Sequence, residues 1–174
     1  PQNFAEYIAH ELSSFEKKFP RRNLNTRESI QVADWRNNQE LEAISDPKHV
    51  IISNEVGSWT VSFSENSKNF SLSGLNRTIR IIGIDTLDQI IPLISPYKKF
   101  LQTVGIAASP IELFRISEQL GQNGVTRITG LGSMTAPEAG WHHDGRFNLL
   151  DLITLTEIES SAEISSDIFA SYTD

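Results

Sequence analysis

The sequence predicts an α/β fold in which a mostly parallel sheet is flanked by helices, and two observations carry this prediction. Two segments with helical periodicity precede three β-rich segments in the first half of the 174-residue chain. The second half contains one strand–helix–strand unit over residues 102–129. Because a helical crossover joins the strands of such a unit, we expect them to be parallel and covered.

The first element is a predicted helix from about Phe4 to Lys18, which Pro20 ends. Asn3 and Glu6 have the spacing of a helix-capping pair. Four basic residues gather where the helix ends: Lys17, Lys18, Arg21 and Arg22. Cations at that position complement the helix dipole, so we interpret the cluster as a solvated helix end in preference to an anion site.

A second helix is predicted from Asn25 and Glu28, another capping pair, to about Ser45. We expect four of its apolar residues to face inward: Ile30, Ala33, Leu41 and Ile44. Three β-rich segments follow, over residues 50–53, 59–64 and 78–84. In the middle one, apolar and hydroxyl side chains alternate from Trp59 to Ser64, which is typical of a half-buried strand with Trp59 in the core.

A short helix from Thr86 to Ile94 is predicted ahead of the strand–helix–strand unit. Its strands are predicted over residues 102–106 and 125–129. Ser109, Pro110 and Glu112 form a strong helix start, so the crossover helix is predicted over residues 110–122.

Composition excludes several classes of function. The formal net charge of −7 argues against general nucleic-acid binding, which requires a basic face. No apolar run approaches the roughly 18 residues of a membrane span, so we expect a soluble, cytoplasmic protein. The chain has no cysteine, which excludes disulfides, cysteine metal sites and a thiol nucleophile within these residues. A start at Pro1 without methionine or leader suggests a fragment or a processed product.

The candidate site is the loop of residues 130–145, which follows the last predicted strand. Ligands of α/β sheets gather beyond the carboxyl ends of parallel strands, where we expect this loop to lie. Gly130 and Gly132 begin a glycine turn that fails as a dinucleotide fingerprint, because Thr135 replaces the last glycine and Pro137 opposes a following helix.

Two adjacent histidines lie within this loop. On extended backbone His142 and His143 point to opposite sides, so we predict no metal site. Asp144 beside them could orient an imidazole, raise its pKa and suit it to proton transfer. The alternative is that Asp144 and Gly145 make a turn and the histidines satisfy local hydrogen bonds, and the residues alone leave both open. We interpret Arg127, on a strand, as paired at the sheet edge in preference to facing an anion.

Three segments carry a resemblance to a known family. They are residues 97–105 (YKKFLQTVG), residues 124–128 (GVTRI) with Gly132, and Trp141 with Asp144-Gly145 ahead of an apolar segment. This series resembles the C-terminal part of the acyl-CoA reductase family of bacterial luminescence, a branch of the aldehyde dehydrogenase superfamily.

The resemblance implies part of an aldehyde-dehydrogenase-like catalytic domain that reduces a long-chain acyl-CoA to the fatty aldehyde. The implied cofactor is NADPH and the implied intermediate an acyl-cysteine. The family's cysteine lies shortly before a pair that resembles Pro1-Gln2, so it would lie upstream of this chain. Under this reading His142, His143 and Asp144 are the catalytic candidates. The residues that would border the substrate or cofactor are Gly130, Gly132, Trp141, Gly145 and Arg127.

The resemblance also implies an organisation and partners. Residues 1–158 would be the post-nucleophile part of the catalytic domain, ending in a dimer-contact strand over about 149–158, and residues 159–174 an acidic tail. The expected partners are the upstream part of the same protein, a second copy, and an acyl-transferring or acyl-activating enzyme. The chain alone should be inactive. The alternative function is that of a non-enzymatic α/β fragment that docks to a partner protein.

Overall fold

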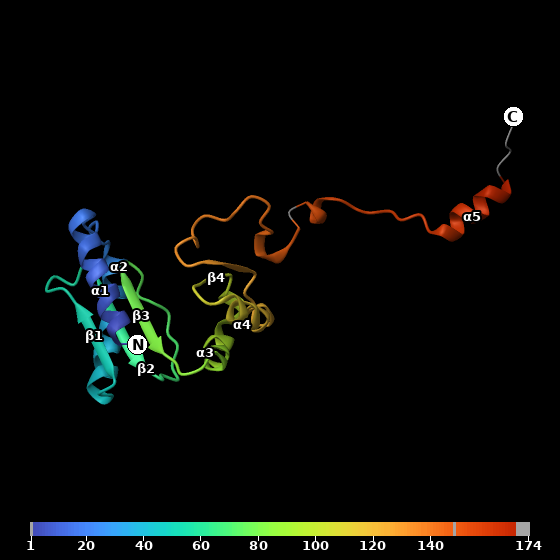
Figure 1. The fold of residues 1–174 in the computed structure, drawn as a ribbon. Helices are drawn as coiled ribbons and strands as arrows, with labels where there is room; N and C mark the ends of the chain where they lie inside the picture. The colour runs from blue at the N-terminus through green and yellow to red at the C-terminus, as the bar shows by residue number, and fades with distance from the viewer. Residues whose placement is uncertain (1, 148, 170–174) are drawn as a thin grey trace.

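The computed structural model describes residues 2–147 and 149–169, and within this part the predicted α/β class is confirmed. Pro1 of the Pro1-Gln2 pair and residues 170–174 of the acidic tail lie outside it. Two helices and a three-stranded sheet form an N-terminal body. Figure 1 shows this body, a second body built on the strand–helix–strand unit, and a C-terminal arm that extends away from both. Tyr97 joins the two bodies by donating a 2.7 Å hydrogen bond to the carbonyl of Phe70.

Helix α1 (Gln2–Lys18) packs on the central strand of the N-terminal body. Ala5 and Ala9 are buried against Trp59, Val61 and Phe63, because their small side chains let the helix approach the strand closely. The helix already includes Gln2 and Asn3, so the predicted capping role of Asn3 is wrong.

Helix α2 (Thr26–Ser45) begins as predicted, with reciprocal 2.9 Å hydrogen bonds between Asn25 and Glu28. Its predicted inward face is wrong. Ile30 and Ile44 are 56% and 83% exposed, and Ala33 and Leu41 are exposed too. The buried residues are Val32, Trp35 and Gln39, on the opposite side of the helix. The error arose because α2 carries apolar residues on both sides, so periodicity alone could not show which side meets the sheet.

The sheet of the N-terminal body has the order β1-β2-β3, from strands β1 (His49–Ser53), β2 (Thr60–Glu65) and β3 (Thr78–Gly83). Strand β2 pairs antiparallel with β1 and parallel with β3. Trp59 is buried, as predicted, but β2 is not half-buried: residues 60–64 are buried throughout. Its apolar side faces α1, and on its hydroxyl side Ser62 donates to Gln39 of α2. Polar side chains are inside here because a second helix covers them.

The second body confirms the strand–helix–strand prediction. After η1 (Leu87–Gln89), α3 (Ile90–Ile94) and η2 (Ser95–Phe100), strand β4 (Thr103–Ile106) pairs in parallel with β5 (Arg127–Gly130). Helix α4 (Pro110–Gln122) connects them, with the predicted capping box of Ser109 and Glu112. The core of this body is formed by Ile116, Leu120 and Val125. Val125 precedes β5 by two residues, so the strand starts later than predicted.

The C-terminal arm differs from the prediction. It contains η3 (His143–Gly145), η4 (Leu150–Leu152) and helix α5 (Ser160–Phe169), with irregular chain over residues 153–159. The segment predicted as a dimer-contact strand over 149–158 pairs with no described segment of this chain, and its pairing with a second copy stays a prediction. In Figure 1 the arm runs outward from the second body.

Candidate functional site

The loop after β5 spans the small parallel sheet from one end to the other. Gly130 ends β5 and Gly132, with φ +95°, turns the chain at the carboxyl ends of the strands, as predicted. The His-Asp-Gly segment does not stay there. Asp144 accepts a hydrogen bond from the side chain of Gln102, which directly precedes β4, and Gly145 lies against Thr126, which precedes β5. Trp141 to Gly145 therefore lie at the amino ends of β4 and β5, roughly 10 Å from Gly130.

His143 and Asp144 are in polar contact at this amino end. The His143 Nδ1 atom lies 3.0 Å from the Asp144 Oδ2 atom, and the side chains are 68% and 57% exposed. Asp144 adopts a left-handed backbone, with φ +53°, and its other carboxylate oxygen is held by Gln102. The carboxylate thus orients the imidazole through its Nδ1 atom. The predicted orientation of a histidine by Asp144 applies to His143.

His142 has a different environment. Its ring packs edge-on against Phe147, with ring centroids 4.6 Å apart. The two histidines thus contact different partners, in keeping with their expected divergence. In residues 2–147 and 149–169 no group of three or more histidine, aspartate or glutamate side chains is placed to hold a metal ion.

Arg127 holds the loop in place. Its guanidinium donates to the carbonyls of Ser133 and Met134, at 3.0 and 2.9 Å, and lies 5.6 Å from the centre of the Trp141 ring. The expected pairing is thus with loop carbonyls and an aromatic face. The indole of Trp141 also contacts the ring of His143, with centroids 5.0 Å apart. Trp141 therefore contacts both Arg127 and His143 at this end of the sheet.

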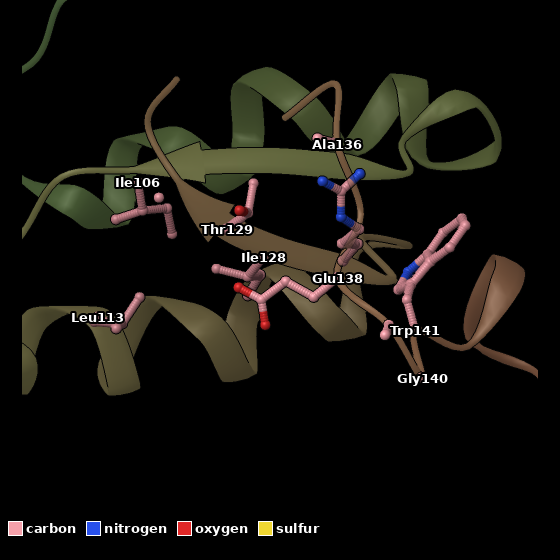
Figure 2. Close-up of a pocket in the computed structure, with 11 residues that line it drawn as sticks. Ile106, Leu113, Ile128, Thr129, Ala136, Glu138, Gly140 and Trp141 are labelled. Atoms are coloured by element: carbon pink, nitrogen blue, oxygen red, sulfur yellow. The ribbon is translucent and has the colours of Figure 1, made fainter. Parts of the chain in front are cut away.

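A cavity of about 530 Å³ lies between β5, α4 and the loop of residues 136–141 (Figure 2). Apolar side chains of Ile106, Leu113 and Ile128 line its inner part. Figure 2 shows Trp141 at one end, while the carboxylate of Glu138 extends from the loop in the direction of Leu113. Arg127 also lines the cavity. The size falls within the roughly 300–1,000 Å³ of small-molecule sites.

Sequence reasoning missed Glu138 and Gln102 as members of this region. Gln102 carried a usable signal, because it lies within the QTVG segment at a strand start, where its side chain can reach an incoming loop. Glu138 carried none, since a single glutamate in a Pro- and Gly-containing loop is ordinary. Gly145 could be explained only with the structure: it has φ +74°, and a Cβ there would lie 3.3 Å from Thr126 Cγ2.

A second polar cluster is buried under α2. His49 Nε2 lies 2.9 Å from Ser62 Oγ, and His49 Nδ1 lies 3.4 Å from a Glu42 carboxylate oxygen that also accepts from Arg80 at 2.9 Å. Serine, histidine and glutamate in this order have the connectivity of a hydrolytic triad. Ser62 is fully buried, however, and its hydroxyl donates to Gln39 Oε1 at 2.5 Å, so no substrate can reach it. The cluster is structural.

Fold and site together define an α/β protein with an open, loop-bordered pocket beside a parallel strand pair and a tethered histidine at its margin. Its sequence contains no thiol of its own. The family model described as Acyl-CoA reductase (LuxC) matches residues 1–155, and the chain therefore belongs to this family of fatty acyl reductases, as the resemblance had indicated. A search of the curated proteins found no match. Within the described ranges, no helix is both long and apolar enough to cross a membrane.

Proposed function

We propose that this chain is the post-nucleophile part of a reductase that converts a long-chain acyl-CoA into the aldehyde through an acyl-cysteine. The observation that carries the proposal is the family match over residues 1–155. The nucleophilic cysteine is proposed to lie upstream of Pro1, because the chain itself contains none. A thiolate attacks the thioester carbonyl, a new carbon–sulfur bond forms, and the CoA thiolate leaves with the electron pair of the broken bond.

The proposed cofactor is NADPH, which supplies a hydride to the acyl carbon when bound. The described residues do not fit a dinucleotide site. Gly132 is followed by a loop, and the pyrophosphate of a dinucleotide is held by the N-terminus of a helix after the glycine turn. We therefore propose that the pyrophosphate of NADPH is held by a part of the protein outside this chain.

His143 and Asp144 are proposed to handle a proton of this reaction, and His142 to share the task or shape the site. Asp144 lies 3.0 Å from the Nδ1 atom of His143 and would orient the imidazole, which is proposed to take a proton from the attacking thiol or give one to the departing CoA sulfur. Gly130, Gly132, Trp141, Gly145 and Arg127 are proposed to border this centre by holding the loop.

The test is acylation of a protein extended upstream through the expected cysteine. Incubation with a long-chain acyl-CoA should add one acyl group by intact mass, which hydroxylamine removes and NADPH discharges as aldehyde. Replacing the expected cysteine with alanine should abolish the adduct. An extended protein that takes up no acyl group would contradict the proposal and support the alternative, a non-enzymatic fragment that docks to a partner.

A proposal about assembly accompanies this one. The arm exposes Leu152, Leu155 and Ile158, and residues 153–159 have no strand partner within the described chain. A segment of this kind is suited to pairing with the sheet edge of a second copy, which would cover its apolar side chains. We therefore propose a homo-oligomer in which this segment forms a strand between copies.

A further inference from the structure

Arg21 and Arg36 line one cavity of about 330 Å³ at the surface of the N-terminal body. The cavity lies between α2 and the segment that connects α1 to α2, and Leu24, Val32 and Asn37 complete much of its wall. Both arginine side chains belong to half-buried residues. Arg21 is part of the basic cluster that the sequence had suggested was only a solvated helix end.

Neither guanidinium has an acidic partner in the part of the chain that the structure describes. Arg21 Nη1 lies 3.4 Å from the carbonyl of Asn76, which is a weak contact with a neutral group. The neighbouring arginines are different, because Arg22 pairs with Glu28 and Arg77 pairs with Glu16. Glu40 also lines the cavity, but no ion pair within the described ranges joins it to either arginine.

Arg36 is seated against a tight turn between β1 and β2. The turn is fixed by a 3.0 Å hydrogen bond from Gly57 N to the carbonyl of Asn54 and a 2.8 Å bond from Ser58 N to Asn54 Oδ1. Gly57 has φ +64°, and a Cβ at this position would collide with Arg36 Nη1. The glycine thus allows the guanidinium to lie directly on the backbone, and the turn restrains it beside the cavity.

These observations describe two guanidinium groups beside one cavity, neither joined by an ion pair to a described acid, although the Glu40 carboxylate belongs to the same lining. Withdrawing a cation from water costs free energy unless an anion or hydrogen-bond acceptors replace the solvent. Guanidinium groups suit phosphate well, because their planar donors make paired hydrogen bonds to its oxygens. Lys17 and Lys18 belong to the adjacent segment and add positive charge near the site, whereas Arg22 is paired with Glu28 and the Glu16 carboxylate accepts from the backbone N of Arg21.

We propose that the Arg21–Arg36 cavity binds a phosphate monoester carried on the ribose of an adenine nucleotide. Acyl-CoA carries such a group at the 3′ position and NADPH at the 2′ position, and both are ligands under the proposed function, on which the choice of ligand rests. Each arginine would present paired N–H donors to the phosphate, and removal of the phosphate would remove the contact.

The test is calorimetric titration of the 174-residue chain with two matched ligand pairs, CoA against 3′-dephospho-CoA and NADPH against NADH. One phosphorylated ligand should bind at least about tenfold more tightly than its counterpart, and the pair that shows the difference identifies the source. Arg36→Gln and Arg21→Gln should each remove the difference. Arg27→Gln, an equal loss of charge at an exposed position on α2 outside the cavity, should preserve it.

Two results would overturn the site: equal affinities within both pairs, or an Arg27→Gln variant that loses as much as Arg36→Gln, which would indicate diffuse attraction. Circular dichroism checks that each variant is folded. If the Arg36→Gln variant does not fold, the Arg21→Gln variant provides the test. Acylation of the extended protein without any preference within the pairs would refute the site and leave the reductase proposal standing. A preference without acylation would keep the site and refute the reductase.

Discussion

At the scale of single residues, Asp144 is the connection between the candidate site and the sheet. One carboxylate oxygen is held by Gln102 at the start of β4, and the other lies 3.0 Å from His143 Nδ1. The position of the imidazole therefore depends on Gln102, next to β4, as well as on the loop. A carboxylate that orients the imidazole in this way would suit the proton-transfer role proposed for His143.

If His143 serves the chemistry, His143→Ala in the complete enzyme should lower turnover by about 10²- to 10⁴-fold, the usual loss for a general acid or base. His142→Ala should be tested singly in the same way, and Asp144→Asn should reproduce part of the His143 effect. The measurement is steady-state aldehyde production. His10→Ala, on the exposed face of α1, is the matched control. Near-normal turnover in both loop-histidine variants would show that this segment is only a structural turn.

A second residue-scale prediction concerns His49. Burial lowers its pKa from the ordinary 6.5; Glu42 opposes the shift, Arg80 adds to it and Asp46 opposes it. The folded protein thus keeps His49 neutral at pH values where the unfolded chain takes up a proton. Its contribution to the free energy of unfolding is complete above about pH 6.5 and is lost as the pH falls toward the folded-state pKa.

Urea denaturation at about pH 7.5 and about pH 5.5 measures this effect. The wild-type chain should lose more stability between these pH values than His49→Gln does, whereas His10→Gln should behave like the wild type. Equal losses in the His49→Gln variant and the wild type would show that the buried cluster does not couple to pH.

At the scale of elements, the helix caps and the strand–helix–strand unit could be predicted from the sequence. Which helix packs on which face of a strand could not. The capping boxes of α2 and α4 and the β4–α4–β5 unit could be predicted, because the hydrogen bonds and periodicity that specify them are encoded within a few residues. The buried side of α2 and the double burial of β2 depend on which element packs against which. Ser62 and Gln39 illustrate this, since their hydrogen bond joins residues 23 positions apart.

The candidate site follows the same division. The loop and its glycine turn could be located from the sequence, whereas the return of Asp144 to the amino end of β4 required Gln102, 42 positions away. Arg127 was expected to pair, but its acceptors proved to be carbonyls, which every residue possesses and no sequence pattern distinguishes.

A prediction at this scale concerns the C-terminal arm and its proposed role in assembly. Leu155 is 70% exposed, and Leu155→Lys places a charge within the apolar segment proposed to pair between copies. Sedimentation should show dissociation of the oligomer, because the charge would have to be buried at the new contact. Ile111→Lys, on the exposed side of α4, is the control and should leave assembly unchanged. An intact oligomer in the Leu155→Lys variant would contradict the inter-copy strand.

At the scale of the whole molecule, the chain lacks the nucleophile that the proposed reaction requires. It holds no thiol, and the hydroxyls of Ser133 and Thr135 belong to an exposed loop, where no described base is bonded to them. Unactivated hydroxyls attack thioesters poorly compared with a thiolate. The parts that make the site are thus expected to come together only in a longer protein.

The 174-residue chain on its own should accordingly form no acyl adduct with a long-chain acyl-CoA and release no aldehyde with NADPH. Intact mass spectrometry and aldehyde detection measure the two steps separately. Acylation of the isolated chain would mean that the nucleophile lies within these residues, with Ser133 and Thr135 as the first positions to replace.

The double coverage of β2 has a consequence for how deuterium enters the protein. Its amides are hydrogen-bonded within a three-stranded sheet and shielded by a helix on each side, so their exchange requires the N-terminal body to open as a unit. Residues 60–65 should therefore retain protons longest in exchange followed by mass spectrometry, while residues 153–159, with no sheet around them, should label within the first time point.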